Sequence, residues 1–515
     1  MNKHAGRLVQ AAALAVVGWS VASAPLSAQP MQDRTLRVGT WDLPPGRGNP
    51  FTGFATPVMF TWHAIFDAMT FVNEKGQTVP ALATSWRNTS PTTWEFTLRS
   101  TKFHNGEALT PQAIQATFAW LQTDEGKSRG ASVSSRVGGI TKVEAKGGNV
   151  VELTTARPNP ILPNDAAIVL IIEPKAWTDV AGFTDRPVGT GPYRQVSFVD
   201  NASAKLTAFE DSWRRPRIRN LEVFDMPERA PRMQAFVSGQ LDIILGAAPD
   251  NLAALRQANA KIDVKPGHQV LTLGFTQINA KDGVDIKPFL DKRVRQALNH
   301  GVDKENMVKN LLSGVGGSAT GQGVASVAFG YHPNVKPYAY DPERAKKLLA
   351  GAGHPNLAFD FDAVPGAFPA DGEIFQQITT DLRKIGVTSN VRAIPFPDWR
   401  AKFLPVNWDS GVWHNLWAAG PSMDATSAFS SQSCGKGTKP YICDPKQQAL
   451  LDQILVEFDV EKRRSLIHQL IELQHEEAIN LFLVEFNNIH ATQPNVVGFR
   501  NENQYINYHE ITFAN

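Results

Sequence analysis

The chain has 515 residues, of which 42% are hydrophobic and 19% are charged. This length is too great for one hydrophobic core and predicts two or three domains, and the composition excludes a disordered or fibrous chain. The 51 Lys and Arg residues almost balance the 49 Asp and Glu residues, which leaves a formal charge of +2. Such a balance argues against nucleic acid or an anionic membrane as a partner.

The N-terminus has the pattern of a secretory signal peptide. Lys3, His4 and Arg7 precede an apolar run over residues 8–22, and small residues follow up to Ala28. We therefore expect residues 1–28 to be a signal peptide that is cleaved after about Ala28. The alternative, an uncleaved anchor, fits less well because the apolar run is short for a membrane span.

The first predicted elements after this segment are a strand and a helix. Apolar alternation over residues 35–45 predicts a strand with Trp41 just past its end, and residues 62–72 place apolar side chains at helical spacing. Residues 93–99 then predict a second strand, because Trp94, Phe96 and Leu98 fall on one face.

A turn and a capped helix follow at residues 103–121. Asn105 and Gly106 favour a tight turn because both residues tolerate positive φ. Thr110 is a suitable N-cap and Pro111 suits the first helical position. The helix predicts a buried stripe that consists of Ala113, Ile114, Thr117, Phe118 and Leu121.

Later helix starts repeat one pattern, an acidic N-cap followed by Pro. Asp341-Pro342 and Asp444-Pro445 each begin a helix in this way, and Asp303 caps a third helix. Apolar strand patterns lie between these helices, which predicts a mixed α/β fold. The absence of a low-complexity linker indicates that the chain crosses between its domains by strands that leave and return.

The two cysteines, Cys434 and Cys443, stand alone with eight residues between them. In an exported protein an isolated pair of this kind indicates a disulfide. The metal alternative is weak because zinc takes three or four ligands at short spacing, and no Cys or His pair stands nearby. We predict a disulfide and no metal site.

Each segment that resembles a catalytic motif lacks a residue that the motif requires. His475 begins a "HEEAI" segment, but Ile479 occupies the place of the second metal-binding His. Residues 126–128 resemble the end of a P-loop, but Leu121 stands where its first Gly belongs, and no Gly-x-Ser-x-Gly motif occurs. The basic cluster at 214–219 is predicted to be the solvated edge of a strand. No catalytic residue and no cofactor is therefore expected. A secreted hydrolase stays the alternative, since a catalytic triad is assembled in space.

Five segments in register resemble one protein family, the family 5 extracellular solute-binding proteins of ABC transporters, the peptide/nickel-binding type. An apolar helix leads into "P-x-L-A-x-x-W", a strand ends in Leu-Arg before Phe-x-x-Gly, and a Gly-Thr-Gly-Pro-Tyr turn follows. A Val-Arg-x-Ala helix and a Tyr-Asp-Pro helix complete the set. The segments are residues 62–86, 93–118, 187–194, 289–308 and 340–353. Within this resemblance the turn at 103–111 is a scaffold feature and not a ligand contact.

The resemblance implies an α/β periplasmic binding protein fold of type II, with two lobes, an extra subdomain, and two crossing hinge strands at 270–279 and 481–488. Lobe I would comprise residues 29–78, an inserted subdomain at 79–187, residues 188–276, and a C-terminal return at 487–515. Lobe II would comprise residues 277–486. A monomer in the periplasm would capture a small ligand, a peptide or peptide-like solute, and deliver it to the permease subunits of an ABC transporter.

Three loops are candidates for the ligand cleft, since such clefts combine aromatic walls with a few polar groups. They span residues 40–51, 158–166 and 410–424, and in the second of them Asn164 and Asp165 are expected near the cleft. The predicted ligand-binding residues are Trp41, Asp42, Trp413, His414, Asn415, Trp417 and Asp424. The alternative for the Trp residues at 413 and 417 is that they belong to the core.

One position departs from the family pattern. In peptide-binding members an acidic residue shortly after a Trp-containing segment in this region holds the free amine of the ligand, and in this chain that segment ends at Trp417. Here the first acidic residue is Asp424, seven positions later. Either Asp424 acts from a shifted place or the ligand has no such amine, so opines, oligosaccharides and metal chelates stay open as ligands.

Overall fold

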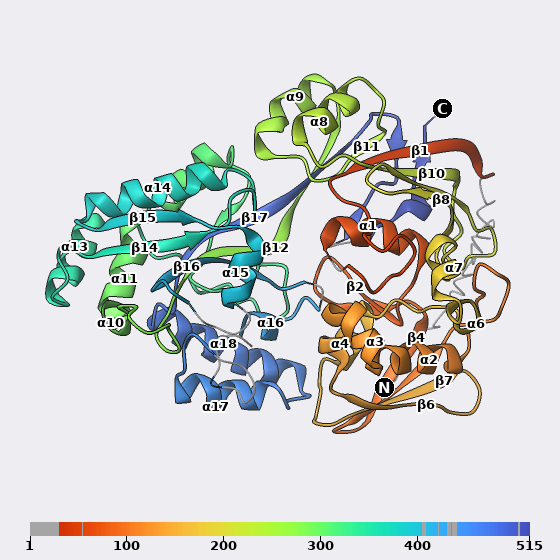
Figure 1. Ribbon diagram of the computed structural model, residues 1–515, viewed down its shortest axis with the longest axis horizontal. Helices are drawn as coiled ribbons and strands as arrows, with labels where there is room; N and C mark the ends of the chain where they lie inside the picture. The colour runs from red at the N-terminus through yellow and green to blue at the C-terminus, as the bar shows by residue number, and fades with distance from the viewer. Residues whose placement is uncertain are drawn as a thin grey trace, which may run out of the picture.

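The computed structural model describes residues 30–53, 55–403, 408–420, 422–429, 434, 440–502 and 505–514. These residues form two lobes that lie side by side, joined by long strands (Figure 1). The predicted signal peptide lies outside the described residues. Within the described part of the chain, no helix is long and apolar enough to span a membrane.

One eleven-stranded sheet runs through both lobes, in the order β15-β14-β16-β12-β17-β11-β1-β10-β9-β8, and β13 pairs with β17. In lobe I, β1 lies parallel to β10 and β11, and β9 joins β10 to β8 in antiparallel pairing. Its strands are β1 (Gln32–Thr40), β8 (Tyr193–Val199), β9 (Ser203–Ala208), β10 (Ile218–Asp225) and β11 (Ile243–Ile244). In lobe II the strands are β13 (Gly317–Ser318), β14 (Ala358–Ala363), β15 (Thr388–Ala393) and β16 (Val412–Ala418).

Two strands, β12 (Lys261–Phe275) and β17 (Asn480–Thr492), cross between the lobes in Figure 1. They pair antiparallel along their length, from Lys261 opposite Thr492 to Gly274 opposite Asn480. Their register shifts between Pro266 and Val270, the stretch where the chain passes from one lobe to the other. The two-lobed α/β architecture and its two crossing hinge strands are confirmed.

A second, four-stranded sheet forms a separate layer of lobe I, in the order β4-β5-β7-β6. Its strands are β4 (Ala83–Ser90), β5 (Thr93–Leu98), β6 (Ile140–Ala145) and β7 (Val150–Thr155). Helix α2 (Pro111–Gln122) packs on this sheet, and all five residues of its predicted stripe are buried. Small two-stranded ribbons are made by β2 (Thr70–Val72) with β3 (Thr78–Pro80), β18 (Val496–Val497) with β21 (Thr512–Phe513), and β19 (Asn501–Glu502) with β20 (Tyr505–Ile506).

The predicted helix starts are also confirmed. Asp341 accepts a hydrogen bond from the backbone N–H of Arg344 at 2.9 Å, and Asp444 accepts one from that of Lys446 at 2.8 Å. The remaining helices of lobe I are α1 (Thr56–Ile65), α3 (Asp124–Arg129), α4 (Ala131–Val137), α5 (Leu162–Asp165), α6 (Pro174–Trp177), α7 (Val180–Asp185), α8 (Arg229–Val237) and α9 (Leu252–Gln257). Those of lobe II are α10 (Lys287–Leu290), α11 (Lys292–Gly301), α12 (Lys304–Asn306), α13 (Pro342–Gly351), α14 (Asp371–Lys384), α15 (Phe396–Phe403), α16 (Thr426–Phe429), α17 (Pro445–Ile454) and α18 (Val460–Glu476).

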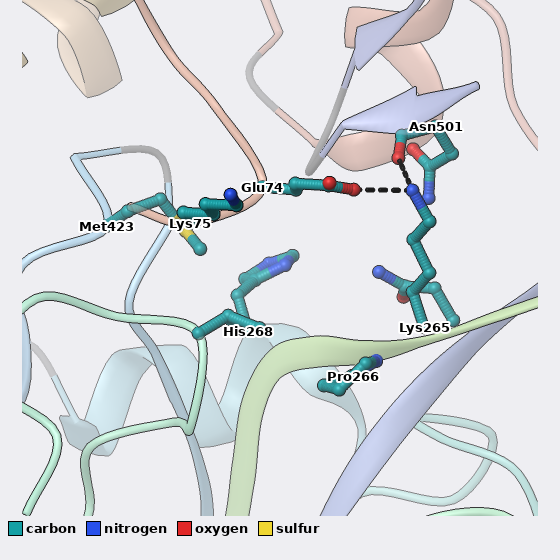
Figure 2. A pocket seen from close by; sticks show the side chains of 9 residues that line it. Glu74, Lys75, Lys265, Pro266, His268, Met423 and Asn501 are labelled. Atoms are coloured by element: carbon teal, nitrogen blue, oxygen red, sulfur yellow. Dashed lines mark hydrogen bonds and ion pairs between the residues drawn. The ribbon is translucent and has the colours of Figure 1, made fainter. Parts of the chain in front are cut away.

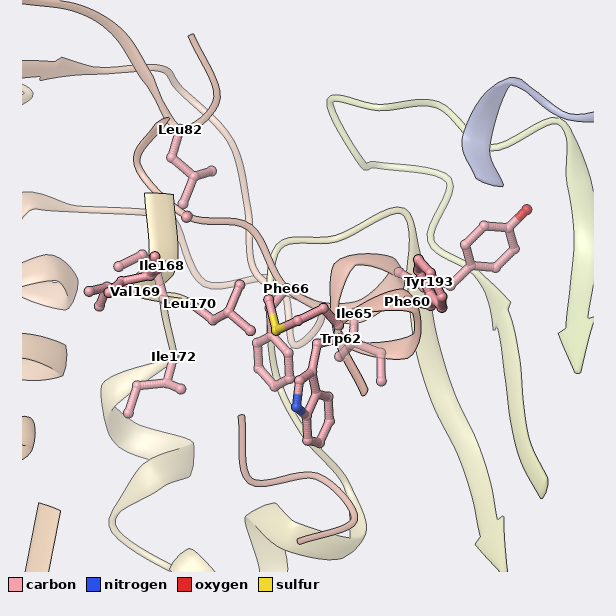
Figure 3. Packing of buried hydrophobic residues seen from close by; sticks show 14 of the residues in the cluster. Phe60, Trp62, Ile65, Phe66, Leu82, Ile168, Val169, Leu170, Ile172 and Tyr193 are labelled. Carbon is pink, nitrogen blue, oxygen red and sulfur yellow. The ribbon is translucent and has the colours of Figure 1, made fainter. Parts of the chain in front are cut away.

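Each lobe has its own hydrophobic core. In lobe I, Trp62 and Phe66 pack close to the segment that carries Ile168 and Leu170 (Figure 3). In lobe II one cluster lies beneath α11 and α14, and a second contains Trp413 and Trp417. Most core residues pack within their own lobe, while Val72 of lobe I joins the second lobe II cluster across the seam.

The prediction for the basic cluster at 214–219 was wrong at its first residue. Arg214 is buried, and its Nη2 lies 2.7 Å from Oδ1 of the buried Asp67. Trp213 Nε1 donates a hydrogen bond to Asp67 Oδ2 at 3.0 Å. The sequence pattern could not reveal this ion pair because the partner is on a distant segment.

Candidate functional site

A hollow of about 340 Å³ lies between the lobes, against the crossing strands. Glu74, Lys75 and Asn501 reach it from lobe I, and Val327 and Met423 reach it from lobe II. The crossing strands provide its floor with Lys265, Pro266, His268 and Asn488. Figure 2 shows Glu74 directed toward Lys265, with His268 between the two sides.

The turn between β2 and β3 places two charged side chains at this hollow. Asn73 stabilises the turn, because its Oδ1 accepts hydrogen bonds from the backbone N–H groups of Lys75 and Gln77 at 2.9 and 3.0 Å. Gly76 completes the turn with φ of +69°, a conformation that glycine adopts without a steric cost. The sequence "NEKG" therefore folds locally so that Glu74 and Lys75 occupy the tip.

The hollow contains charges of both signs. Glu74 Oε2 lies 2.5 Å from Lys265 Nζ, which also donates to the Asn501 carbonyl at 3.1 Å. The hydrogen bond from Lys265 and the positive charges of Lys265, Lys75 and Arg500 lower the pKa of Glu74, so it is ionised at neutral pH. The site thus offers a carboxylate beside two ammonium groups.

Two buried polar atoms at the hollow have no hydrogen-bond partner among the described residues, namely His268 Nδ1 and Asn501 Oδ1. Burial lowers the pKa of His268 to about 4, so its imidazole is neutral at neutral pH. A Cβ atom at position 420 would lie 3.0 Å from the ring of His268, so Gly420 leaves room for it. Buried polar groups normally find partners, so these two atoms distinguish this wall of the hollow.

A second hollow, of about 630 Å³, lies farther along the seam between the lobes. Lobe I contributes residues 155–161 and Asp165, and lobe II contributes Leu455, Val456 and Arg463. Burial raises the pKa of Asp165 to about 7, and the negative charge of Asp424 across the seam adds to this effect. The structure therefore places Asn164 and Asp165 at the contact between the lobes.

The predicted residues at 412–418 do not form a loop, and that expectation was wrong. They form β16, which lies inside the large sheet between β14 and β12. Trp413 is fully buried, with its ring stacked on Trp408 at 4.5 Å between centroids and edge-on to Tyr441 at 4.9 Å. Trp417 is 4% exposed and belongs to the same cluster, so the structure favours the core alternative for both residues.

The other predicted residues do not line the first hollow either. His414 and Asn415 are buried on β16, and burial lowers the pKa of His414 to about 4. Trp41 packs edge-on against Phe60 in lobe I, at 5.8 Å between centroids, and burial raises the pKa of Asp42. Asp424 is buried in an ion pair with Arg463. Ligand contact by these residues stays a prediction.

Of the residues that line the first hollow, only Met423 lies in one of the three predicted loops, the one at 410–424. Asn73 and Gly76 are residues that favour a tight turn, but their types do not indicate that the turn faces the other lobe. His268 and Lys265 lie on a strand whose ends belong to different lobes, and no local pattern marks that position. The predicted disulfide between Cys434 and Cys443 is confirmed.

A hollow between two lobes, with charged side chains at its rim and hinge strands as its floor, defines a protein that binds a small solute. Residues 77–439 match the model of the bacterial extracellular solute-binding proteins, family 5 Middle. The chain belongs to this family, whose members are binding proteins of ABC transporters and not enzymes.

Several known proteins are similar to the chain. The dipeptide-binding protein of Escherichia coli (strain K12) is 25% identical over 88% of this chain and 90% of its own length. Heme-binding protein A of Haemophilus influenzae is 27% identical, but the match covers 57% of this chain and 53% of that protein. The structure of HbpA2 from Haemophilus parasuis has a TM-score of 0.80 at 20% identity and covers 94% of this chain and 100% of that one.

Proposed function

We propose that this protein captures a short peptide or a peptide-like solute between its lobes and delivers it to the permease subunits of an ABC transporter. It would act in the periplasm as a monomer, after removal of residues 1–28. Lobe II, residues 277–486, would close on lobe I about the two crossing strands and release the solute when it opens again.

The observation that carries this proposal is the pairing of opposite charges in the first hollow. A peptide has an ammonium group at one end and a carboxylate at the other. Glu74 can bind the former, and Lys75 and Lys265 can bind the latter, while His268 and Asn501 hold unpartnered polar atoms for the peptide group. The likeness to a dipeptide-binding protein over almost the whole chain supports the same ligand class.

A second candidate ligand is a metal complex. His268 is neutral at neutral pH, which is the form of imidazole that binds metal ions, and Met423 lines the same hollow. The partial likeness to a heme-binding protein agrees with this candidate.

Native mass spectrometry of the protein purified from its own periplasm distinguishes these ligands. A bound mass that fragments as a peptide supports the proposal, and a metal isotope pattern supports the second candidate. A protein that carries neither, and whose small-angle scattering profile stays unchanged in a library of di- and tripeptides, would contradict peptide capture.

A further inference from the structure

The turn at residues 73–77 of lobe I docks directly on the backbone of lobe II. A Cβ atom on Gly76 would lie 2.9 Å from the carbonyl oxygen of Val327 and 3.5 Å from that of Met423. Both contacts are to backbone atoms, which cannot swing aside as a flexible side chain can. A glycine at this position therefore permits the close approach of the two lobes as well as the turn itself.

Asn164, at the end of α5, makes a second contact across the seam. Its Nδ2 donates a hydrogen bond to the Ser422 carbonyl of lobe II at 2.9 Å, and its Oδ1 accepts one from Thr78 Oγ1 at 2.7 Å. Thr78 begins β3, the strand that leaves the turn with Gly76. The side chain of Asn164 is thus oriented from lobe I and satisfies a backbone oxygen of lobe II.

The two contacts meet on one surface of lobe II. The backbone N–H of Phe329 donates to the Met423 carbonyl at 2.8 Å, and that of Ala425 donates to the Phe329 carbonyl at 3.0 Å, so the loops at 327–329 and 422–425 are joined. Met423 also lines the first hollow. The same contacts therefore bring Glu74 and Lys75 to the hollow and hold them against lobe II.

We propose that Gly76 and Asn164 form an interlobe clasp, which stabilises the closed protein by direct contact between the lobes and positions Glu74 and Lys75 for the solute. Neither contact involves a ligand. The closed form is then populated before a solute binds. A bound solute shifts the equilibrium between open and closed forms further toward the closed form. This inference depends on the two lobes and not on the identity of the solute.

The test is single-molecule energy transfer between dyes on two introduced cysteines, Lys205→Cys on lobe I and Lys346→Cys on lobe II. Both lysine side chains are exposed. Bound solute is first removed by partial unfolding and dialysis. Asn164→Asp keeps the acceptor for Thr78 but turns an oxygen toward the Ser422 carbonyl, and Gly76→Ala places a methyl group against lobe II.

Gly148→Ala is the matched control. Gly148 has φ of +68°, against +69° for Gly76, so alanine meets the same backbone strain, but no atom lies within 4 Å of its added methyl group. We expect a measurable closed population in the solute-free parent and in Gly148→Ala. Asn164→Asp and Gly76→Ala should each lower the ratio of closed to open molecules by about tenfold or more.

The inference would be overturned by equal closed populations in the four proteins, or by a parent protein that is always open without solute. Either result leaves solute capture untouched, because no ligand is present in the experiment.

Discussion

The guanidinium of Arg463 forms a bidentate ion pair with the carboxylate of Asp424: Nη1 lies 2.7 Å from Oδ2, and Nη2 lies 2.8 Å from Oδ1. The two side chains are 5% and 2% exposed. Thr426 donates two further hydrogen bonds to Asp424, from its backbone N–H and its hydroxyl group. Both carboxylate oxygens therefore accept hydrogen bonds from within lobe II, and the ion pair ties Asp424 to α18.

The first prediction concerns this ion pair. Asp424→Asn should lower the free energy of unfolding by about 3–5 kcal/mol, because it leaves the buried charge of Arg463 without its counterion. Urea unfolding measures the change. Asp452→Asn, on the exposed face of α17, is the control and should change stability by less than about 0.5 kcal/mol. A variant of Asp424 with normal stability and no bound solute would instead identify this residue as a ligand contact.

The second prediction separates packing from binding at Trp413 and Trp417. Since both rings belong to the lobe II core, Trp→Ala at either position should cost about 3–5 kcal/mol of stability. The folded fraction should still carry its solute. Thermal unfolding and native mass spectrometry of the same samples give the two quantities. An unchanged melting temperature with weakened solute binding would show that these rings line the binding site.

The third prediction tests the carboxylate of the first hollow. Glu74→Gln should weaken solute binding by about tenfold, as expected for the loss of one charge-assisted contact. Stability should change by less than about 1 kcal/mol, because the ion pair with Lys265 is partly exposed. Glu343→Gln removes a similar exposed ion pair, with Lys346 on α13, and is the control. Equal solute retention in the two variants would exclude Glu74 from the site.

The fourth prediction is a dependence of stability on pH that arises from Asp165. Burial first and the charge of Asp424 second raise the pKa of Asp165 to about 7, against the hydrogen bond from Asn159 and the positive charges of Arg136 and Arg463. In the unfolded chain an aspartate has a pKa of about 4. Between these values the folded protein binds a proton that the unfolded chain does not.

The contribution of Asp165 to stability is therefore complete below a pH of about 4, and it is lost as the pH rises from about 4 to about 7. Asp165→Asn cannot ionise, so its stability relative to wild type should be higher at pH 8 than at pH 4.5. Urea unfolding at both values measures this difference. A difference between the two proteins that is the same at both pH values would contradict a raised pKa.

Much of this protein is determined by its sequence locally. Pro111 and the five-residue stripe that follows predict the start and the buried face of α2, because a helix repeats every 3.6 residues and Pro suits its first position. The side chain of Thr110 makes no capping hydrogen bond. Acidic caps before Pro342 and Pro445 mark two more helices correctly. The sequence also predicts the disulfide and the crossing strands. The disulfide follows from the exported compartment and the cysteine spacing, and the crossing strands follow from the family resemblance.

The site was decided by tertiary structure. The aromatic segment around Trp413 looks like a cleft wall in the sequence, but the large sheet adds strands on both of its sides and buries it. Glu74, His268, Met423 and Asn501 come from four distant segments, and the packing of the two lobes brings them together. Local spacing determines periodicity and capping, whereas the partner of a side chain across a seam depends on where the whole chain places it.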